Sequence, residues 1–486
     1  KDVEIVVAVG YQGDKVYEYL QHAHPDRVIK CIFVDNYDGT GSGPGHSLLC
    51  CKDELQCPFV LTTADTLTPE AEKIEVYDHN WMGICDGMYH EREEYCTAKI
   101  EHECVSELYD KVPNGTSSVF IGLAGVYDFI LFWEGLEDSS IGANNEKQLL
   151  GGFQKLIDEC CDFRAHYYYD WVDTGTKEDY VCEKIGLEDQ EQFDFSKANE
   201  HTYKIDGRLI KYFEDKDIVE KRCQRALKLG DSVPEIVLKT DSFFSYDMVP
   251  GEVLYDCYDA GVTKDFLTWC IANLWASYPQ KEGSGYEASF RLSCELFYKK
   301  KTKERLAKFY MKYPSLVDQP TVVNGLELPS LGSLLTKIDW DSLIGSAIPV
   351  MFHGDLQYDN VVKTGDGYKL IDWRQSFGNH LVGDLYYDLA KMYGGLTLPY
   401  RLIKSNKFEY SEVNGDIKYD FDTSNNLSTS REVFEKFVDK CGFDLHNIKL
   451  LRALIYLNMS PLHEHPFDKM LYYMSRYYLN EVLNEG

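Results

Sequence analysis

The chain has 486 residues, of which 44% are hydrophobic and 14% aromatic, and this composition excludes disorder as its main state. The net charge of −30 argues against a nucleic-acid partner, and no uncharged apolar run reaches the about 18 residues that membrane insertion requires. The 15 cysteines include no CxxC pair, which indicates reduced thiols and a cytoplasmic protein.

Predicted strands and helices alternate in the first third of the chain. Strands are expected at 3–9, 27–36 and 58–66, and helices at 14–23 and 46–55. Buried strands that alternate with helices favour a mostly parallel sheet covered on both faces. Exposed or antiparallel strands, an apolar strand and a further helix are then expected at 95–110, 117–127 and 145–161.

An acidic stretch without a clear period, residues 183–200, predicts a domain boundary, which we place between 186 and 187. Beyond it, two strands flank Asp206-Gly207, a pair typical of tight hairpins, and a helix is expected at 217–230. From Thr263 onward the pattern is mainly helical, with an interruption at 349–375.

That interruption contains the most specific motif of the chain. His353-Gly354-Asp355-Leu356 is followed by Asn360 and then by Asp372. Phosphoryl transfer needs a carboxylate that orients the substrate hydroxyl, and an amide and a second carboxylate that hold Mg²⁺ on the ATP phosphates. The interval from Asp355 to Asn360 is the one found in the H-R-D-L-x-x-x-N loop of kinases. The alternative is a solvated turn rich in Asp and Asn.

Residues 353–360 (HGDLQYDN) and 371–392 resemble the aminoglycoside phosphotransferase and choline kinase superfamily. The resemblance implies an α+β, bilobal, protein-kinase-like domain, with an N-lobe at 187–250 and a mostly helical C-lobe at 251–486. It also implies roles for individual residues: Asp355 is the catalytic base, and Asn360 and Asp372 are Mg²⁺ ligands. Asp384 and Asp388 are expected to brace the loops.

Upstream residues fit the same resemblance. Lys211, in the strand RLIKYF, is expected to contact the ATP phosphates, and Glu220 on the next helix is expected to pair with it. The backbone of Asp247, Met248 and Val249 corresponds to the hinge that meets the adenine. The alternatives are an exposed strand lysine for Lys211 and a solvated helix residue for Glu220.

The first domain has a separate candidate site. Asp65 follows the apolar run LTTA, and Asp173 follows WV far downstream. Carboxyl ends of parallel strands are where α/β domains bind ligands. Two aspartates there can clamp Mg²⁺ on a nucleoside triphosphate while a phosphate oxygen attacks its α-phosphorus. The alternative for Asp65 is a turn residue at the end of a strand.

The segments ADTL (64–67) and WVDTGT (171–176) resemble the sugar-phosphate and phosphocholine nucleotidyltransferases. This resemblance implies an α/β, Rossmann-like mixed sheet at 1–186, metal ligation by Asp65 and Asp173, and a phosphate contact from Lys111. The glycine-rich segment 39–49 either contacts nucleotide or is a flexible loop. The opening G-x-G-x-R loop of that family is missing. Either the sequence is N-terminally incomplete, or the domain has lost this nucleotide cradle.

Together these motifs predict a bifunctional enzyme. The second domain would phosphorylate a small alcohol such as choline or ethanolamine with ATP, and the first would couple the phosphate ester to CTP or another NTP. Trp373 and Tyr386 are candidates for contacts with a quaternary ammonium group, with core residues as the alternative. Two other functions remain open: a sugar kinase with a sugar-phosphate nucleotidyltransferase, and a kinase whose first domain is not catalytic. A homo-oligomer is also possible.

Overall fold

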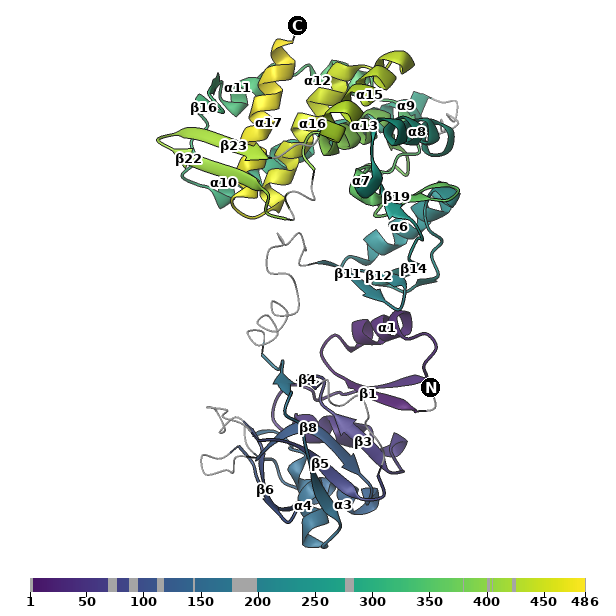
Figure 1. Cartoon of the computed structure of the whole chain (residues 1–486), viewed down its shortest axis with the longest axis vertical. Coiled ribbons are helices and arrows are strands. Elements are labelled where there is room, and N and C mark those ends of the chain that lie inside the picture. The colour runs from purple at the N-terminus through teal and green to yellow at the C-terminus, as the bar shows by residue number, and fades with distance from the viewer. Residues whose placement is uncertain are drawn as a thin grey trace. The chain divides into compact units, whose positions relative to one another are not determined.

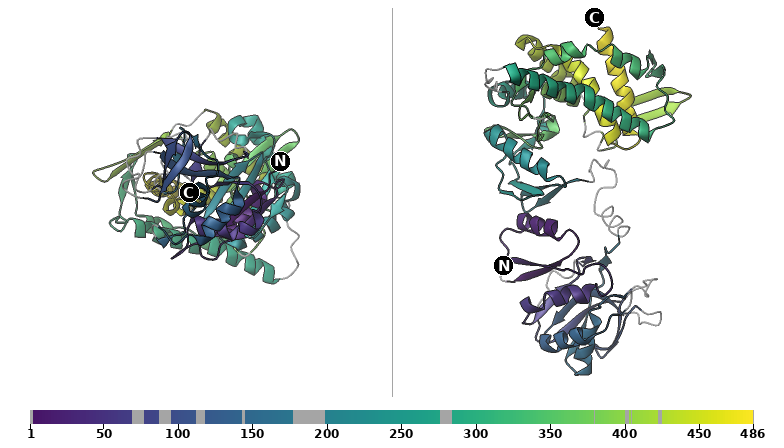
Figure 2. Two further views of the ribbon diagram at one scale, coloured as in Figure 1. Left: turned by 90° about the horizontal axis from the view of Figure 1, so that it is seen from below. Right: turned by 180° about the vertical axis from the view of Figure 1, so that it is seen from behind.

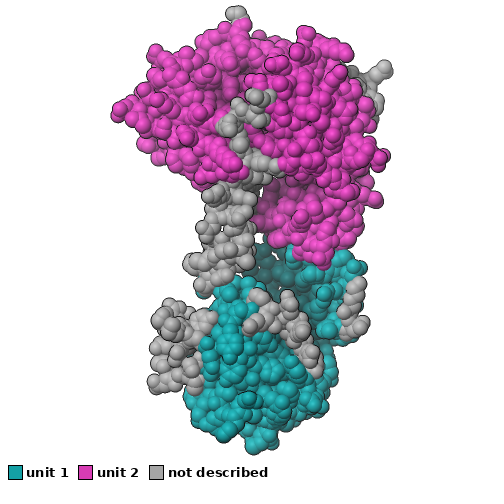
Figure 3. All heavy atoms as spheres, in the orientation of Figure 1, with its two compact units in different colours: residues 1–190 teal, residues 191–486 magenta. Residues whose placement is uncertain are grey.

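The computed structural model describes residues 3–68, 77–86, 95–111, 118–142, 145–176, 199–275, 284–378, 380–399, 403, 405–421 and 425–485. The chain divides into two compact units, unit 1 (residues 1–190) and unit 2 (residues 191–486), which Figure 3 colours separately. The boundary expected between 186 and 187 lies outside the described residues. No helix in the described segments is both long and apolar enough to cross a bilayer.

Unit 1 contains a parallel strand pair and a six-stranded mixed sheet (Figure 1). The pair is formed by β1 (Ile5–Val9) and β2 (Ile29–Phe33), which α1 (Gly13–Ala23) connects. The six-stranded sheet has the order β3-β8-β5-β9-β7-β6. Its strands are β3 (Phe59–Thr62), β5 (Asn80–Asp86), β6 (Thr97–Glu101), β7 (Cys104–Tyr109), β8 (Ser118–Val126) and β9 (Phe163–Tyr167).

The expectation of a mostly parallel sheet is wrong for the described strands. In the six-stranded sheet only β5 and β9 pair in parallel, and β3 pairs with β8 in antiparallel orientation. In the described part of the chain, β1 and β2 pair only with each other. The alternation of patterns predicted which segments are strands and which are helices. Apolar runs, however, do not determine which strands pair with each other.

Both faces of this sheet are buried along β8, whose apolar side chains point to both sides. Along β8, Val119, Ile121 and Leu123 join one apolar cluster, whereas Ala124 and Val126 join the cluster under the helices. This division follows the two-residue period of a strand. Two helices, α3 (Phe129–Asp138) and α4 (Leu150–Asp158), cover the second face. The short helix α2 spans Pro44–Cys50.

Unit 2 begins with an antiparallel sheet of order β11-β12-β14-β13. The predicted hairpin is confirmed: Asp206 and Gly207 have φ values of 47° and 79°, the left-handed conformations that a two-residue turn between twisted strands needs. The strands are β11 (Glu200–Ile205), β12 (Arg208–Phe213), β13 (Leu238–Lys239) and β14 (Phe243–Asp247), and the helix that follows β12 is α6 (Lys216–Leu229).

The remainder of unit 2 is mainly helical, as expected (Figures 1 and 2). Its helices are α7 (Leu254–Cys257), α8 (Ala260–Trp269), α9 (Ser284–Glu295), α10 (Lys301–Lys312), α11 (Leu331–Thr336), α12 (Trp340–Gly345), α13 (Leu385–Gly395), α15 (Asn425–Cys441), α16 (Leu445–Met459) and α17 (Phe467–Asn484). The short strands near the candidate site are β15 (Glu252–Val253), β18 (Pro349–Val350), β19 (Val361–Thr364), β20 (Gly367–Leu370) and β21 (Gly383–Asp384).

One sheet of unit 2 was not expected from the sequence. Its order is β17-β16-β23-β22, and its strands are Leu326–Leu328 (β17), Thr321–Val323 (β16), Asp416–Phe421 (β23) and Phe408–Val413 (β22). Each of its two hairpins turns at an Asn-Gly pair with positive φ at both residues, Asn324-Gly325 and Asn414-Gly415. Asn-Gly is a strong hairpin signal, so the sequence did carry the information.

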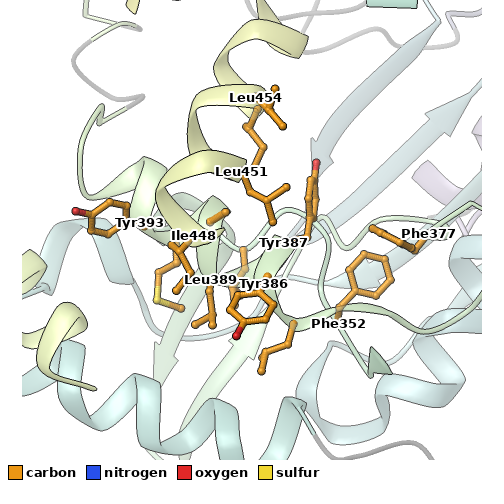
Figure 4. Close-up of a cluster of buried hydrophobic side chains, with 14 of the residues drawn as sticks. Phe352, Phe377, Tyr386, Tyr387, Leu389, Tyr393, Ile448, Leu451 and Leu454 are labelled. Atoms are coloured by element: carbon orange, nitrogen blue, oxygen red, sulfur yellow. The ribbon is translucent and has the colours of Figure 1, made fainter. Parts of the chain in front are cut away.

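The core of unit 2 joins the helices to the loop that holds the kinase-like motif. Figure 4 shows this core, in which Phe377 packs against Phe352 and against Tyr387 of α13, and Leu389 of α13 lies beside Ile448 of α16. Phe352 immediately precedes His353 and is fully buried. The motif is therefore anchored by apolar side chains on both flanks.

Candidate active sites

A cavity of about 490 Å³ in unit 2 is lined by Asp355, Asn360 and Asp372. The three residues come from the segment that contains the β19–β20 hairpin. The hairpin reverses the chain, so the two ends of this segment meet. The amide of Ile371 donates to the carbonyl of Asn360 at 2.9 Å, and the amide of Arg374 donates to the carbonyl of His353 at 2.9 Å. The motif predicted from spacing is thus brought together in one place.

Asp388 and Asp384 support the loop from behind. The carboxylate of Asp388 accepts the amides of His353 and Gly354, both at 2.7 Å. Asp384 accepts the amide of Ile348 at 2.9 Å and the hydroxyl of Tyr298 at 2.6 Å. Burial raises the pKa of each carboxyl to about 6. These contacts are the bracing that the sequence predicted for both aspartates.

His353 has a fixed orientation inside the loop. Its Nδ1 accepts the amide of Asp355 at 3.2 Å, and its Nε2 lies 2.9 Å from the carbonyl of Ile371. Burial lowers the pKa of His353 to about 4, so the ring is neutral at neutral pH and Nε2 carries the proton. A neutral histidine thereby ties the backbone at Asp355 to the backbone next to Asp372.

Lys391 is a residue that sequence reasoning missed. From α13 its Nζ reaches Oδ1 of Asp355 at 2.8 Å. Burial by itself raises the pKa of Asp355, but the ion pair with Lys391 and the hydrogen bond from Gln357 outweigh it and lower that pKa. The carboxylate of Asp355 is therefore ionised at neutral pH and held in position.

Asp372 and Asn360 offer oxygen atoms to the same cavity. Asp372 adopts a φ of 59°, a left-handed conformation that is uncommon outside glycine and is often found at functional sites. Its Oδ1 lies 2.6 Å from Nζ of Lys211 on β12. Asn360 donates its Nδ2 to the carbonyl of Asp355 at 2.9 Å, which leaves its Oδ1 as an acceptor. Such oxygens suit Mg²⁺.

Two features of the predicted ATP site differ from expectation. Glu220 does not pair with Lys211; its carboxylate binds Lys239 and Gln224, because β13 lies beside its end of α6. The amide of Met248 donates to the carbonyl of Gly207 at 2.8 Å, so it is not available to adenine. Asp247 lies 3.4 Å from Arg208, and neither it nor Val249 lines the cavity.

The aromatic candidates also lie elsewhere. Trp373 is 1% exposed and donates to the carbonyl of Arg222, and Tyr386 is 6% exposed and accepts the amide of Asp444. Both belong to the core, the alternative given for them above. The rings that line the cavity are Phe297, Tyr298 and Tyr387.

Unit 1 has a smaller pocket, of about 230 Å³, which is lined by Asp65, Asp173 and Lys111. Asp65 lies in a turn between β3 and β4 (Thr66–Leu67), and Asp173 ends β10 (Val172–Asp173), which pairs with β4. The amide of Thr174 donates to the carbonyl of Asp65 at 2.9 Å. Two segments more than a hundred residues apart thus bring their aspartates to one place.

Gly175 lies beside both carboxylates of this pocket. A Cβ at this position would lie 3.0 Å from Oδ1 of Asp173 and 3.2 Å from Oδ2 of Asp65. The amide of Gly175 donates to Asp173 at 2.8 Å, and Tyr95 donates its hydroxyl to the other oxygen of Asp173 at 2.9 Å. The glycine therefore allows the two acidic side chains to approach each other.

The glycine-rich segment 39–49 packs against the chain itself. The amides of Gly41 and Gly45 donate to the carbonyls of Asn145 and Lys147, both at 2.8 Å. A Cβ at Gly45 would lie 2.5 Å from the carbonyl oxygen of Gln148, so the close approach requires glycine. These two amides are therefore engaged within the protein and are not free for nucleotide.

Comparison with known proteins gives only distant likenesses, since no family model and no curated protein matches the chain. The solved structures that match its N-terminal part include three enzymes. They are a UDP-glucose pyrophosphorylase complexed with UDP-glucose (14% identity, 38% of this chain and 80% of that chain, TM-score 0.33), a nucleoside-diphosphate-sugar pyrophosphorylase from Vibrio cholerae (13%, 37% and 80%, TM-score 0.32) and an inositol-1-phosphate CTP transferase from T. maritima (13%, 38% and 76%, TM-score 0.30). Likenesses this low do not extend to activity or substrate.

Proposed function

We propose that unit 2 is a small-molecule kinase that transfers the γ-phosphoryl group of ATP to an alcohol. The observation that carries this proposal is the common cavity of Asp355, Asn360 and Asp372, with Lys211 paired to Asp372. Asn360 and Asp372 would hold Mg²⁺, which neutralises charge on the phosphates when bound. Lys211 would then be released from Asp372 toward the phosphates.

Asp355 would orient the acceptor hydroxyl toward the phosphorus. Its lowered pKa makes it a weak base, so its main task is positioning, and the proton leaves late in a loose transition state. Lys391 keeps the carboxylate in place, and the neutral His353 keeps the backbone of Asp355 in place.

The test of the kinase proposal is ADP release from Mg²⁺–ATP with a panel of small alcohols. Replacement Asp355→Asn should lower the rate by about 10²–10⁴-fold, because the carboxylate that orients the hydroxyl and finally takes its proton is lost. Asp366→Asn, at an exposed turn of the same hairpin, is the matched control and should change nothing. Equal rates for both variants would reject the assignment of Asp355.

For unit 1 we propose nucleotidyl transfer from CTP or another NTP to the phosphate ester made by unit 2. The support is that Asp65, Asp173 and Lys111 line one pocket. The two aspartates would hold Mg²⁺, and Lys111 would contact a phosphate. Pyrophosphate release from each NTP, with choline phosphate, ethanolamine phosphate and sugar phosphates as acceptors, tests this activity and the sugar alternative together.

A unit 1 that only binds nucleotide is the second candidate. The engaged amides of Gly41 and Gly45 favour it, because a nucleotidyltransferase needs donors for a triphosphate and these two are in use. Nucleotide binding without pyrophosphate release from any NTP would select this candidate.

A further inference from the structure

Basic side chains gather in the unit 2 cavity beside its acidic residues, although the whole chain carries a net charge of −30. Four basic side chains of its lining lie within interaction distance of Lys301 or include it, and we call them the cationic cluster: Lys301, Arg305, Arg374 and Lys391. Lys301 and Arg305 lie one turn apart on α10, and α16 also lines the cavity with Leu451, Leu454 and Asn458.

Within the described part of the chain, three members of the cationic cluster have no acidic partner. Lys391 is paired with Asp355, and Asp372 is already paired with Lys211. Among the residues that the structure describes, Lys301, Arg305 and Arg374 form no ion pair. The Nε of Arg374 is buried without a hydrogen-bond partner. A buried cation without a counter-ion is costly, so a ligand that supplies negative charge would be favoured here.

The Phe297 ring in the cavity is already covered by basic side chains of the protein. Nζ of Lys301 lies 4.1 Å from the centroid of the Phe297 ring, and Cζ of Arg374 lies 4.9 Å from it. Trp373 and Tyr386 are in the core. A quaternary or primary ammonium substrate would therefore find no free ring of Phe297 and would meet like charges instead.

The electrostatics of Lys301 agree with an anion site. Burial, together with the nearby charges of Arg374, Lys391 and Arg305, lowers the pKa of Lys301 to about 6, so its amine is largely neutral at neutral pH until an anion binds. A bound anion would favour the charged form of the lysine and offset the repulsion among the four cations.

We propose that the alcohol substrate of unit 2 is an anion, a small hydroxy compound whose carboxylate or phosphate binds Lys301, Arg305 and Arg374 while its hydroxyl faces Asp355. This proposal rests on the kinase function above. In the reaction the hydroxyl oxygen bonds to the γ-phosphorus of ATP, and the bond from that phosphorus to the β–γ bridging oxygen breaks. ADP leaves with the electron pair, and the hydroxyl proton passes to Asp355 and then to solvent.

The first experiment compares acceptors that differ in charge at similar size. Glycerate and glycerol 3-phosphate are the anions, glycerol is the neutral compound, and choline and ethanolamine are the cations; ADP release from Mg²⁺–ATP is measured with each. We expect kcat/KM for an anion to exceed the values for the other three by at least about tenfold, the effect of one charged hydrogen bond. A preference for glycerol, choline or ethanolamine would overturn the anion proposal and leave the kinase proposal standing.

The second experiment uses variants on one helix. Lys301→Met and Arg305→Met should each raise the KM for the anionic acceptor by about 10- to 100-fold with little change in the KM for ATP. Lys303→Met, at an exposed position of α10, is the matched control. If instead the KM for ATP rises as much as the KM for the acceptor, the cationic cluster binds the γ-phosphate and the proposal is wrong.

A binding measurement decides the matter if no acceptor in the panel is used. With Mg²⁺–ADP at saturation, inorganic phosphate should raise the melting temperature of the full chain in a saturable way. Lys301→Met and Arg305→Met should remove this effect, and Lys303→Met should keep it. No stabilisation by phosphate, or stabilisation unchanged in both variants, would overturn the anion site. Failure of Mg²⁺–ATP itself to bind would reject the kinase proposal separately.

Discussion

Nζ of Lys211 lies 2.6 Å from Oδ1 of Asp372. The contact joins β12 of the four-stranded sheet to the segment after β20, two parts of unit 2 that are far apart in sequence. Lys211 also donates to Oγ1 of Thr202 on the neighbouring strand at 3.0 Å, so its direction is set from two sides. The lysine thus neutralises a carboxylate that the proposed reaction assigns to Mg²⁺.

The first prediction concerns this ion pair. Lys211→Met should raise the KM for Mg²⁺–ATP by about 10- to 100-fold, because one charged contact with the phosphates is lost. Lys204→Met, an exposed change on β11 of the same sheet, is the control. Steady-state kinetics at varied ATP checks it. An unchanged KM would mean that Lys211 has only the structural role seen in its pairing with Asp372.

The second prediction concerns the bracing of the loop that holds His353, Gly354 and Asp355. Asp388→Ala should lower the free energy of unfolding by about 2–5 kcal/mol, because two buried amides and the Trp275 indole lose their acceptor. Asp388→Asn should lower it less, since its amide oxygen still accepts one of these donors. Urea unfolding of the full chain gives both values. Equal losses would show that the charge, and not the acceptor, holds the loop.

The third prediction follows from the pKa of Asp388, which burial raises from 3.8 to about 6. Between these values the folded chain holds a proton that the unfolded chain has released. The contribution of the Asp388 proton to the free energy of unfolding is therefore complete below about pH 4 and is lost as the pH rises through about 6. Relative to Asp388→Asn, the wild type should lose stability over this range. If the free energy of unfolding of the wild type relative to Asp388→Asn stayed constant or increased as the pH rises, the raised pKa would be contradicted.

The sequence predicted best what is local. Asp355, Asn360 and Asp372 flank one hairpin, which brings the two ends of their segment together, so their spacing already predicts that they meet. The ion-pair partner of Glu220 depends on where β13 lies in the fold. The presence of Lys301 in the cavity depends on how α10 packs. Neither can be predicted from residue spacing. Lysines are also frequent between residues 299 and 312, so nothing in the sequence marks Lys301 among them.

The strand order of unit 1 could not be predicted from the sequence for a related reason. The apolar runs of β3 and β8 indicate burial, but their antiparallel pairing is set by connections that the pattern does not reveal. By contrast, the hairpins at Asn324-Gly325 and Asn414-Gly415 had a readable signal and were overlooked inside a region that reads as helical.

The last prediction concerns the two aspartates of unit 1, which line one pocket with Gly175 beside them. Carboxylates at close range repel, and a bound cation relieves the repulsion. Mg²⁺–CTP should therefore raise the melting temperature of unit 1 by mass action on its folded state. Asp65→Ala and Asp173→Ala should each remove this shift and leave ADP release by unit 2 unchanged, because its site has its own ligands.

Gly175→Ala makes the same test without removing a charge. Its Cβ would lie 3.0 Å from Asp173 and 3.2 Å from Asp65, tighter than ordinary contact, so the carboxylates must move apart and the shift should shrink. Gly345→Ala, where a Cβ meets nothing within 4 Å, is the control. Thermal melts of the full chain, with unit 2 saturated by Mg²⁺–ADP, isolate the effect of CTP. A shift that survives all three changes would place the metal away from Asp65 and Asp173.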